Sequence, residues 1–183
     1  MKKKNLNIEE TFYLALKSHK NNDFSSAEKF YSKILKTNPN HFNSIFYLAS
    51  MFAQISNFNK AKELFEKAIK IKPDYAIAYS NLGAVLKELG NFEESIKICQ
   101  KAIEIDPKNS ATYSNLGAAL REVGRFKDSV NACEKAIKTL DCGYCHMNGS
   151  ERDMLDAQAL ASFLRVLCPD WTETRLIGIP DYG

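Results

Sequence analysis

The sequence predicts an all-α solenoid of four 34-residue helix-turn-helix repeats plus a C-terminal capping helix, and three observations support this prediction. The tetrapeptide Asn-Leu-Gly-Ala at 81–84 recurs at 115–118, a step of 34 residues. The same step aligns one phenylalanine in every unit: Phe24, Phe58, Phe92 and Phe126. Apolar residues also recur at helical spacing within each unit, and no residue is inserted or deleted across the four copies.

The repeat frame divides the chain of 183 residues into three parts. Residues 1–7 form a basic N-terminal tail. Residues 8–141 form the four repeats, with boundaries at 8–41, 42–75, 76–109 and 110–141. Residues 142–183 hold the predicted capping helix and a C-terminal tail. A shift in composition marks this last boundary, because all 20 lysines lie within the first 140 residues.

Each unit is expected to fold as two helices that approach each other closely. In the third unit, the Gly-Asn pair at 90–91 ends a first helix, and a second helix follows over about 92–104. Small residues recur on both helices, so Gly83 is expected to face Ser95, and Gly117 to face Ser129. An isolated helix pair cannot bury its apolar side, and neighbouring units should therefore stack.

The segment after the last repeat is expected to form a helix from about Glu151 to Leu167. Ser150 and Asp153 have the spacing of a capping box at its N-terminus, and Pro169 ends it. Its apolar stripe consists of Met154, Ala157, Leu160, Ala161, Leu164 and Leu167. This helix would cover the apolar face of the last repeat, which no further repeat buries.

Composition and charge exclude several classes of protein. The formal net charge of +3 is too small to indicate a nucleic-acid binder. No stretch reaches the roughly 18 consecutive apolar residues that a membrane span needs. The basic start is not followed by the apolar segment of a signal peptide, and an odd number of cysteines agrees with a reducing compartment. We therefore expect a cytoplasmic protein with neither a membrane nor a nucleic-acid partner.

The motif Cys142-x-x-Cys145-His146 matches the attachment site of c-type haem, and Cys168 could complete a zinc site with these residues. Haem attachment requires export, for which the sequence carries no signal. A helix of about 17 residues, roughly 25 Å long, separates Cys168 from the other ligands. We expect a plain turn at 142–146, no metal site and no cofactor, with haem and zinc as the open alternatives.

Nothing in the sequence supports an active site. There is no Gly-rich phosphate loop, no His-Glu-x-x-His and no Gly-x-Ser-x-Gly, and only three histidines are present. Cys99 and Cys133 share a repeat position that Tyr31 and Phe65 occupy in the first two units. We expect both cysteines to be buried packing residues, and we expect no enzyme activity.

The pattern resembles the tetratricopeptide repeat family over about residues 8–141. In the third unit the matching residues are Tyr79, Leu82, Gly83, Leu86, Phe92, Ser95, Cys99, Ala102 and Pro107. The Tyr-Ser-Asn-Leu-Gly runs are most similar to the superhelical repeats of O-linked N-acetylglucosamine transferases. The resemblance implies a right-handed superhelix whose first helices line a concave groove that binds peptides or protein surfaces.

The resemblance also implies which side chains line the groove. Its first half is expected to be aromatic, with Phe12, Tyr13, Phe46 and Tyr47. Its second half is expected to present small, amide and basic side chains: Ser80, Asn81, Ser114, Asn115, Lys87 and Arg121. An asparagine amide can pair with a peptide backbone, and the two cations could attract carboxylates or phosphate.

A purely structural role remains an open alternative for each of these residues. The asparagines could lie on a solvated helix face, the aromatic residues could be buried against neighbouring helices, and each cation could sit on a mixed charged surface beside the glutamate that follows it. Chaperone-tail binding is not expected, because Phe12 and Leu16 stand where chaperone-binding members of the family carry basic and asparagine residues.

Two functions are therefore considered. The first is a non-catalytic protein–protein interaction scaffold that binds a protein or extended peptide in the groove, with no expectation about its oligomeric state. The alternative is the substrate-recognition arm of a glycosyltransferase, sulfotransferase or oxygenase whose catalytic domain is absent or truncated. The 43 residues after the first 140 are too few for a catalytic core of that kind.

Overall fold

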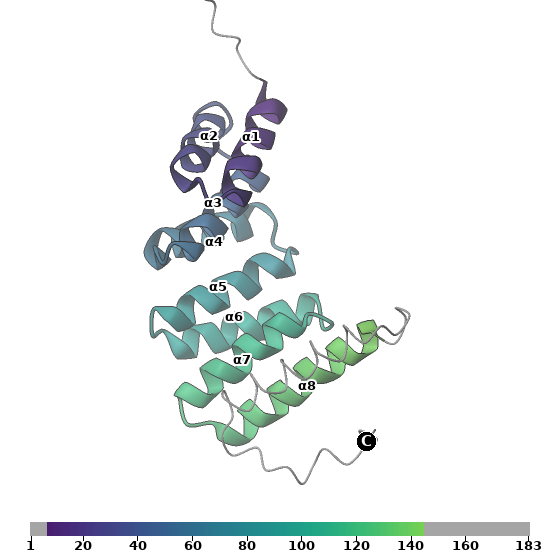
Figure 1. Cartoon of the computed structure of the whole chain (residues 1–183). Coiled ribbons are helices and arrows are strands. Elements are labelled where there is room, and N and C mark those ends of the chain that lie inside the picture. Colours follow the sequence, from purple (N-terminus) through teal and green to yellow (C-terminus); the bar gives the residue numbers. More distant parts are fainter. Residues whose placement is uncertain (1–6, 145–183) are drawn as a thin grey trace, which may run out of the picture.

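The computed structural model describes residues 7–144, with side chains up to residue 139, as eight helices in four consecutive pairs (Figure 1). The first helices of the pairs are α1 (Ile8–Lys20), α3 (Phe42–Gln54), α5 (Ala76–Glu88) and α7 (Ser110–Glu122). The second helices are α2 (Phe24–Thr37), α4 (Phe58–Ile71), α6 (Phe92–Ile105) and α8 (Phe126–Tyr144). The predicted all-α repeat solenoid is confirmed.

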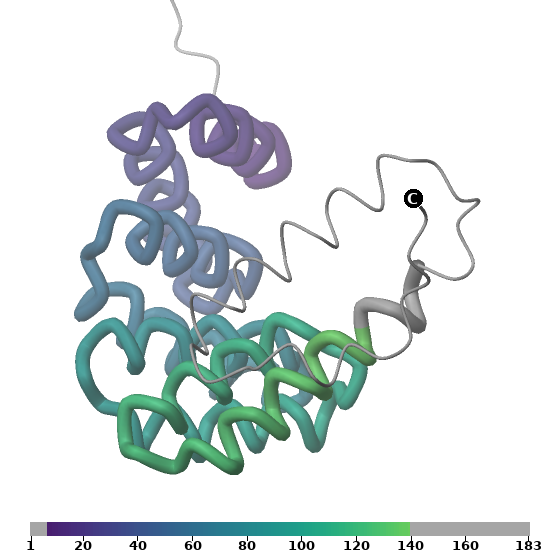
Figure 2. Tube along the Cα trace, turned by 60° about the horizontal axis from the view of Figure 1, so that its bottom comes forward, coloured from purple at the N-terminus to yellow at the C-terminus, as the bar shows by residue number. Residues whose placement is uncertain are grey.

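The helix pairs follow one another in chain order along a curved stack. The purple α1–α2 pair lies at one end and the green α7–α8 pair at the other (Figure 2). One apolar cluster runs through the first five helices, and a second joins Ile96 of α6 to Ala119 and Leu120 of α7 and Ala132 of α8. Each unit thus buries its apolar side against its neighbours, as expected for a solenoid.

The four first helices begin at the residues that the 34-residue frame predicts, and their ends have a shared cause. The residue two positions after each first helix has a positive φ: Asn22 (59°), Ser56 (58°), Gly90 (76°) and Gly124 (76°). This left-handed conformation reverses the chain between the two helices of a unit. Glycine adopts it without strain, whereas Ser56 adopts it at a steric cost.

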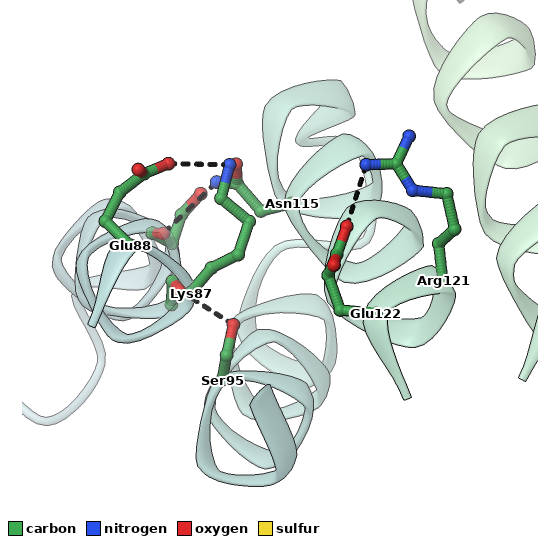
Figure 3. Close-up of polar contacts among 8 residues, drawn as sticks. Lys87, Glu88, Ser95, Asn115, Arg121 and Glu122 are labelled. Atoms are coloured by element: carbon green, nitrogen blue, oxygen red, sulfur yellow. Dashed lines mark hydrogen bonds and ion pairs between the residues drawn. The ribbon is translucent and has the colours of Figure 1, made fainter. Parts of the chain in front are cut away.

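Within the third and fourth units, a serine fastens the second helix to the first. The Ser95 hydroxyl donates a hydrogen bond of 2.7 Å to the carbonyl of Gly83 (Figure 3), and Ser129 donates an equal bond to the carbonyl of Gly117. A Cβ atom at Gly83 would lie only 2.5 Å from the Cys99 sulfur. The expected close approach at these small residues is confirmed.

Helix α8 differs from the prediction at its C-terminal end. It has 19 residues, whereas each of the other second helices has 14, and it continues through Tyr144 where a turn was expected. Asp141 replaces the proline that follows the second helix in the other units, and one internal glycine, Gly143, costs a helix only about 1 kcal/mol. Cys145, His146, Cys168 and the predicted capping helix lie outside the described residues.

The outer face of the last repeat retains apolar residues. Phe126 is 61% exposed, whereas the phenylalanines at the same position of the other three units are half-buried. Val130 is half-buried, whereas its counterpart Ile96 is buried against α7. The first unit is different, since the exposed Glu10 and Lys17 stand where later units bury their residues. The last repeat therefore presents a surface suited to being covered.

Removing residues 151–183 is expected to leave that surface exposed to water. The shortened chain should aggregate or unfold less cooperatively, as measured by thermal unfolding with light scattering. Deletion of residues 176–183 alone, beyond the predicted helix, is the matched control and should leave the transition unchanged. A chain ending at residue 150 that stays monomeric and keeps the full melting temperature would show that the removed segment is not a cap.

Replacing Gly83 with alanine is expected to lower the stability of the chain when Cys99 is present and to raise it when Cys99 is replaced by alanine. With Cys99 present, the added methyl group meets the sulfur, and overpacking should cost about 1 kcal/mol of stability. In the Cys99→Ala background, the higher helix propensity of alanine should stabilise the chain by up to about 1 kcal/mol. Chemical denaturation of the double-mutant cycle measures both signs, and destabilisation in both backgrounds would contradict this account.

Candidate functional site

Side chains at matching positions of the first helices meet between the first and second units and between the third and fourth units. The Tyr47 ring of α3 packs on the Phe12 ring of α1, with centroids 5.9 Å apart. The Asn115 amide of α7 donates a hydrogen bond of 3.3 Å to the carbonyl of Ser80 in α5 (Figure 3). In both contacts, the sixth residue of one unit meets the fifth residue of the unit before it.

We call the surface at the fifth, sixth and ninth residues of each unit the first-helix face. Its members come from α1, α3, α5 and α7: Phe12, Tyr13, Leu16, Phe46, Tyr47, Ser50, Ser80, Asn81, Ala84, Ser114, Asn115 and Ala118. The face contains eight of the ten residues that were expected to contact a partner. The other two, Lys87 and Arg121, lie further along α5 and α7.

The aromatic half of the face has exposed and buried members. Tyr13 is 65% exposed and Tyr47 is 38% exposed, whereas Phe12 is half-buried. Phe46 is buried and lies 5.4 Å from Tyr47 and 5.3 Å from Tyr75 between ring centroids. Phe46 therefore supports the face from beneath and does not form its surface, because neighbouring helices cover it as the alternative interpretation allowed.

The two asparagines have different surroundings. Asn115 is tied to the preceding unit by its bond to the Ser80 carbonyl. The corresponding acceptor for Asn81 is the Phe46 carbonyl, which instead accepts a hydrogen bond of 3.0 Å from the Ser50 hydroxyl in its own helix. Among the described residues, the half-buried Asn81 side chain makes no hydrogen bond. Its amide is thus the one available to an incoming peptide group.

The two serines contribute little exposed polar surface. Ser80 is buried, and its carbonyl accepts the Asn115 bond. Ser114 is half-buried, and its hydroxyl donates a hydrogen bond of 3.2 Å to the carbonyl of Ser110 in the preceding turn of α7. The Ser114 hydroxyl is therefore already engaged within its own helix, and the buried Ser80 adds almost no exposed surface to the face.

Each of the two expected cations lies against the glutamate that follows it. Lys87 Nζ is 2.9 Å from Glu88 Oε1, and an Arg121 guanidinium nitrogen is 2.8 Å from Glu122 Oε1 (Figure 3). These are exposed pairs of adjacent residues, which contribute little to stability but lower the local net charge to near zero. An incoming carboxylate would have to compete with the glutamate in each pair.

Three further residues occupy positions that the resemblance places along the groove, although they are not among the ten residues expected to contact a partner. Ile77 of α5 is 44% exposed and lies one helical turn before Ser80 and Asn81 of the face. His19 Nε2 of α1 lies 2.9 Å from Gln54 Oε1 of α3, so it joins the first two units. Their positions in the repeat could have identified them from the sequence. Ile77 is the second residue of its unit, His19 the twelfth and Gln54 the thirteenth, and the resemblance implies that these positions line the groove.

The described side chains include no group of three histidine, cysteine or acidic residues placed to hold a metal ion. Cys99 and Cys133 are buried thiols, so their expected role as packing residues is confirmed. Burial raises the pKa of Cys99 to about 11, which keeps the sulfur protonated and unreactive near neutral pH.

None of the described helices is long and apolar enough to cross a bilayer.

The stacked helix pairs, with one face formed by their first helices, define an α-helical repeat protein. Sequence profiles of the family agree with this class: a profile named tetratricopeptide repeat matches residues 74–141, and one named TPR repeat matches residues 49–90. The chain belongs to the tetratricopeptide repeat family. This fold supports a role in protein interaction. No curated protein sequence matches the chain.

Solved structures are similar to this chain over most of the array. A crystal structure of MamA is 22% identical with a TM-score of 0.72, and the match covers 76% of this chain and 82% of that chain. MamA from residue 41 to its end, from Desulfovibrio magneticus RS-1, is 23% identical with a TM-score of 0.66, and the match covers 78% of each chain.

A glycosyltransferase structure is also similar to part of the chain. An O-GlcNAc transferase mutant from Thermobaculum terrenum is 25% identical with a TM-score of 0.58. The match covers 62% of this chain but only 22% of that chain. The likeness therefore concerns the repeat fold and not the larger part of the transferase.

The different surroundings of the two asparagines predict different effects on stability. Asn115→Ala removes a hydrogen bond between units and should cost about 1 kcal/mol, whereas Asn81→Ala should cost a few tenths at most. Urea denaturation of each variant, followed by circular dichroism, measures the difference. Equal losses for the two variants would show that the bond to Ser80 does not hold the third and fourth units together.

Proposed function

We propose that this chain is a non-catalytic scaffold that binds an extended segment of a protein partner on its first-helix face. The observation that supports this best is that the sixth residues of three consecutive units are the exposed Tyr13, the exposed Tyr47 and the half-buried Asn81, whose amide makes no hydrogen bond among the described residues. Aromatic side chains and an available amide suit the contacts of a bound chain, namely apolar packing and pairing with its backbone.

The packing beneath the first-helix face favours binding without rearrangement. Tyr47 rests on Phe12 and on Phe46, and the centroid of each ring lies within 6 Å of that of Tyr47. A side chain held in this way loses little freedom when a partner arrives, which lowers the entropic cost of association. The second half of the face is formed by small side chains, so an extended chain can approach it closely: Ser80, Ser114 and Asn115.

The proposal also covers the class of the binding partner and the cellular compartment. A protein partner is favoured over nucleic acid, because the basic residues at the twelfth position are each paired with a glutamate. A reducing compartment such as the cytoplasm suits the reduced thiols of Cys99 and Cys133. Neither cysteine is exposed, which favours a packing role over catalysis.

The second candidate is the recognition arm of a glycosyltransferase, favoured by the likeness to the repeats of the O-GlcNAc transferase from Thermobaculum terrenum. On this interpretation, the same face would hold the substrate of a catalytic unit supplied elsewhere. The described residues alone should show no turnover of a nucleotide sugar, and such turnover would contradict the non-catalytic assignment.

Tyr47→Ala combined with Asn81→Ala tests the proposed function. A partner identified by affinity capture and mass spectrometry, and then purified, should bind this double variant at least about tenfold more weakly than the wild type. The helical circular-dichroism signal should stay unchanged. Lys33→Ala with Lys36→Ala, on the exposed side of α2, is the control and should bind normally. Equal binding by wild type and double variant would show that the first-helix face is not the binding surface.

A further inference from the structure

The centre of the first-helix face carries no charge in any unit. Its twelve residues are aromatic, aliphatic, hydroxyl or amide side chains, from Phe12 in α1 to Ala118 in α7. Helix α3, which lies in the middle of this stretch, has no charged residue at all. Surface helices normally carry charges on the side that faces water, so this uncharged stretch is unusual for a solvated face.

The charges that border the face cancel. The second, twelfth and thirteenth residues of the four units include three acidic and three basic residues: Glu9, Lys20, Lys87, Glu88, Arg121 and Glu122. Four of them form the two ion pairs within α5 and α7. Glu9 and Lys20 lie at opposite ends of α1. A charged partner would therefore find no net charge of opposite sign along this path.

Exposed lysines that form no ion pair within the described part of the chain lie on another surface. Lys29, Lys33 and Lys36 are exposed on α2, and none forms an ion pair with another described residue. An acidic segment would be attracted to this side of the first unit before it was attracted to the first-helix face. The two surfaces can thus be separated by experiment.

Exposed apolar side chains give the uncharged path its anchors. Among the described residues, Tyr13, Tyr47 and Ile77 are three of the six large apolar side chains that are exposed. They come from α1, α3 and α5, one from each consecutive first helix. Asn81, with its unused amide, lies one helical turn beyond Ile77 on α5.

We propose that the partner segment is uncharged where it contacts this face and lies across α1, α3 and α5. Its apolar side chains pack on Tyr13, Tyr47 and Ile77, and one of its peptide groups pairs with the Asn81 amide. This inference rests on the proposed function and specifies the chemistry of the partner. It implies an affinity that is insensitive to salt, since no ionic contact is formed.

Selection from a random peptide display library on the full chain tests the inference. Peptides of about 12 residues are long enough, because they span about 40 Å when extended. The selected peptides should lack acidic and basic residues at the positions that alanine scanning shows to be important. Their affinities should change less than about twofold between about 0.05 and 0.5 M sodium chloride.

Four variants locate the binding path. Tyr13→Ala with Ile77→Ala should weaken binding at least about tenfold. Asn81→Ala should weaken binding more than Asn115→Ala does at matched folded fraction, because only Asn81 has an unused amide. Lys29→Gln with Lys33→Gln and Lys36→Gln is the charge control and should leave the affinity of the peptides unchanged.

The outcomes separate failure of this inference from failure of the proposed function. Acid-rich peptides whose affinity falls steeply with salt, yet still depends on Tyr47, would overturn the uncharged partner and leave the first-helix face in place. Loss of binding in the triple lysine variant alone would move the site to α2 and overturn both. Peptides that bind regardless of every first-helix substitution would overturn the proposed function itself.

Discussion

The close approach of the two helices within each unit is the constraint on which the rest of the structure depends. Alanine, glycine or serine occupies the meeting point in every copy, and a larger residue would push the helices apart. The Ser95 bond to the Gly83 carbonyl shows how tight this contact is. Because a small residue stands at this position in all units, the helices of each pair can approach closely and neighbouring pairs can stack in one register.

Most of the fold could be predicted because its signals are local and repeated. The step of 34 residues, together with the residues that break the chain, is enough to locate the starts of the first helices. The end of α8 was not predicted, since the missing proline at Asp141 allows the helix to continue and nothing nearby forbids it. A helix that continues because a proline is missing is harder to predict from the sequence than a helix that a proline ends.

The sequence predicts which residues lie on the first-helix face, but it does not predict which of them are hydrogen-bonded or buried. Repeat position identifies Asn81 and Asn115 as equivalent, yet only Asn115 reaches the preceding unit. The difference comes from Ser50, whose hydroxyl already occupies the carbonyl facing Asn81, and that competition depends on a side chain in another helix. Similarly, the burial of Phe46 results from neighbours such as Tyr75, which sequence spacing alone does not bring together.

The contacts between first helices join residues 35 positions apart, one more than the repeat length, as in Phe12 with Tyr47 and Ser80 with Asn115. Packed helices lie about 8–10 Å apart, and three residues of extended chain cover about 10 Å. In a strand, side chains three residues apart point to opposite faces, so a strand-like segment would not turn the same edge toward successive units. A polyproline II helix, with three residues per turn and about 3.1 Å per residue, would turn one edge toward α1, α3 and α5.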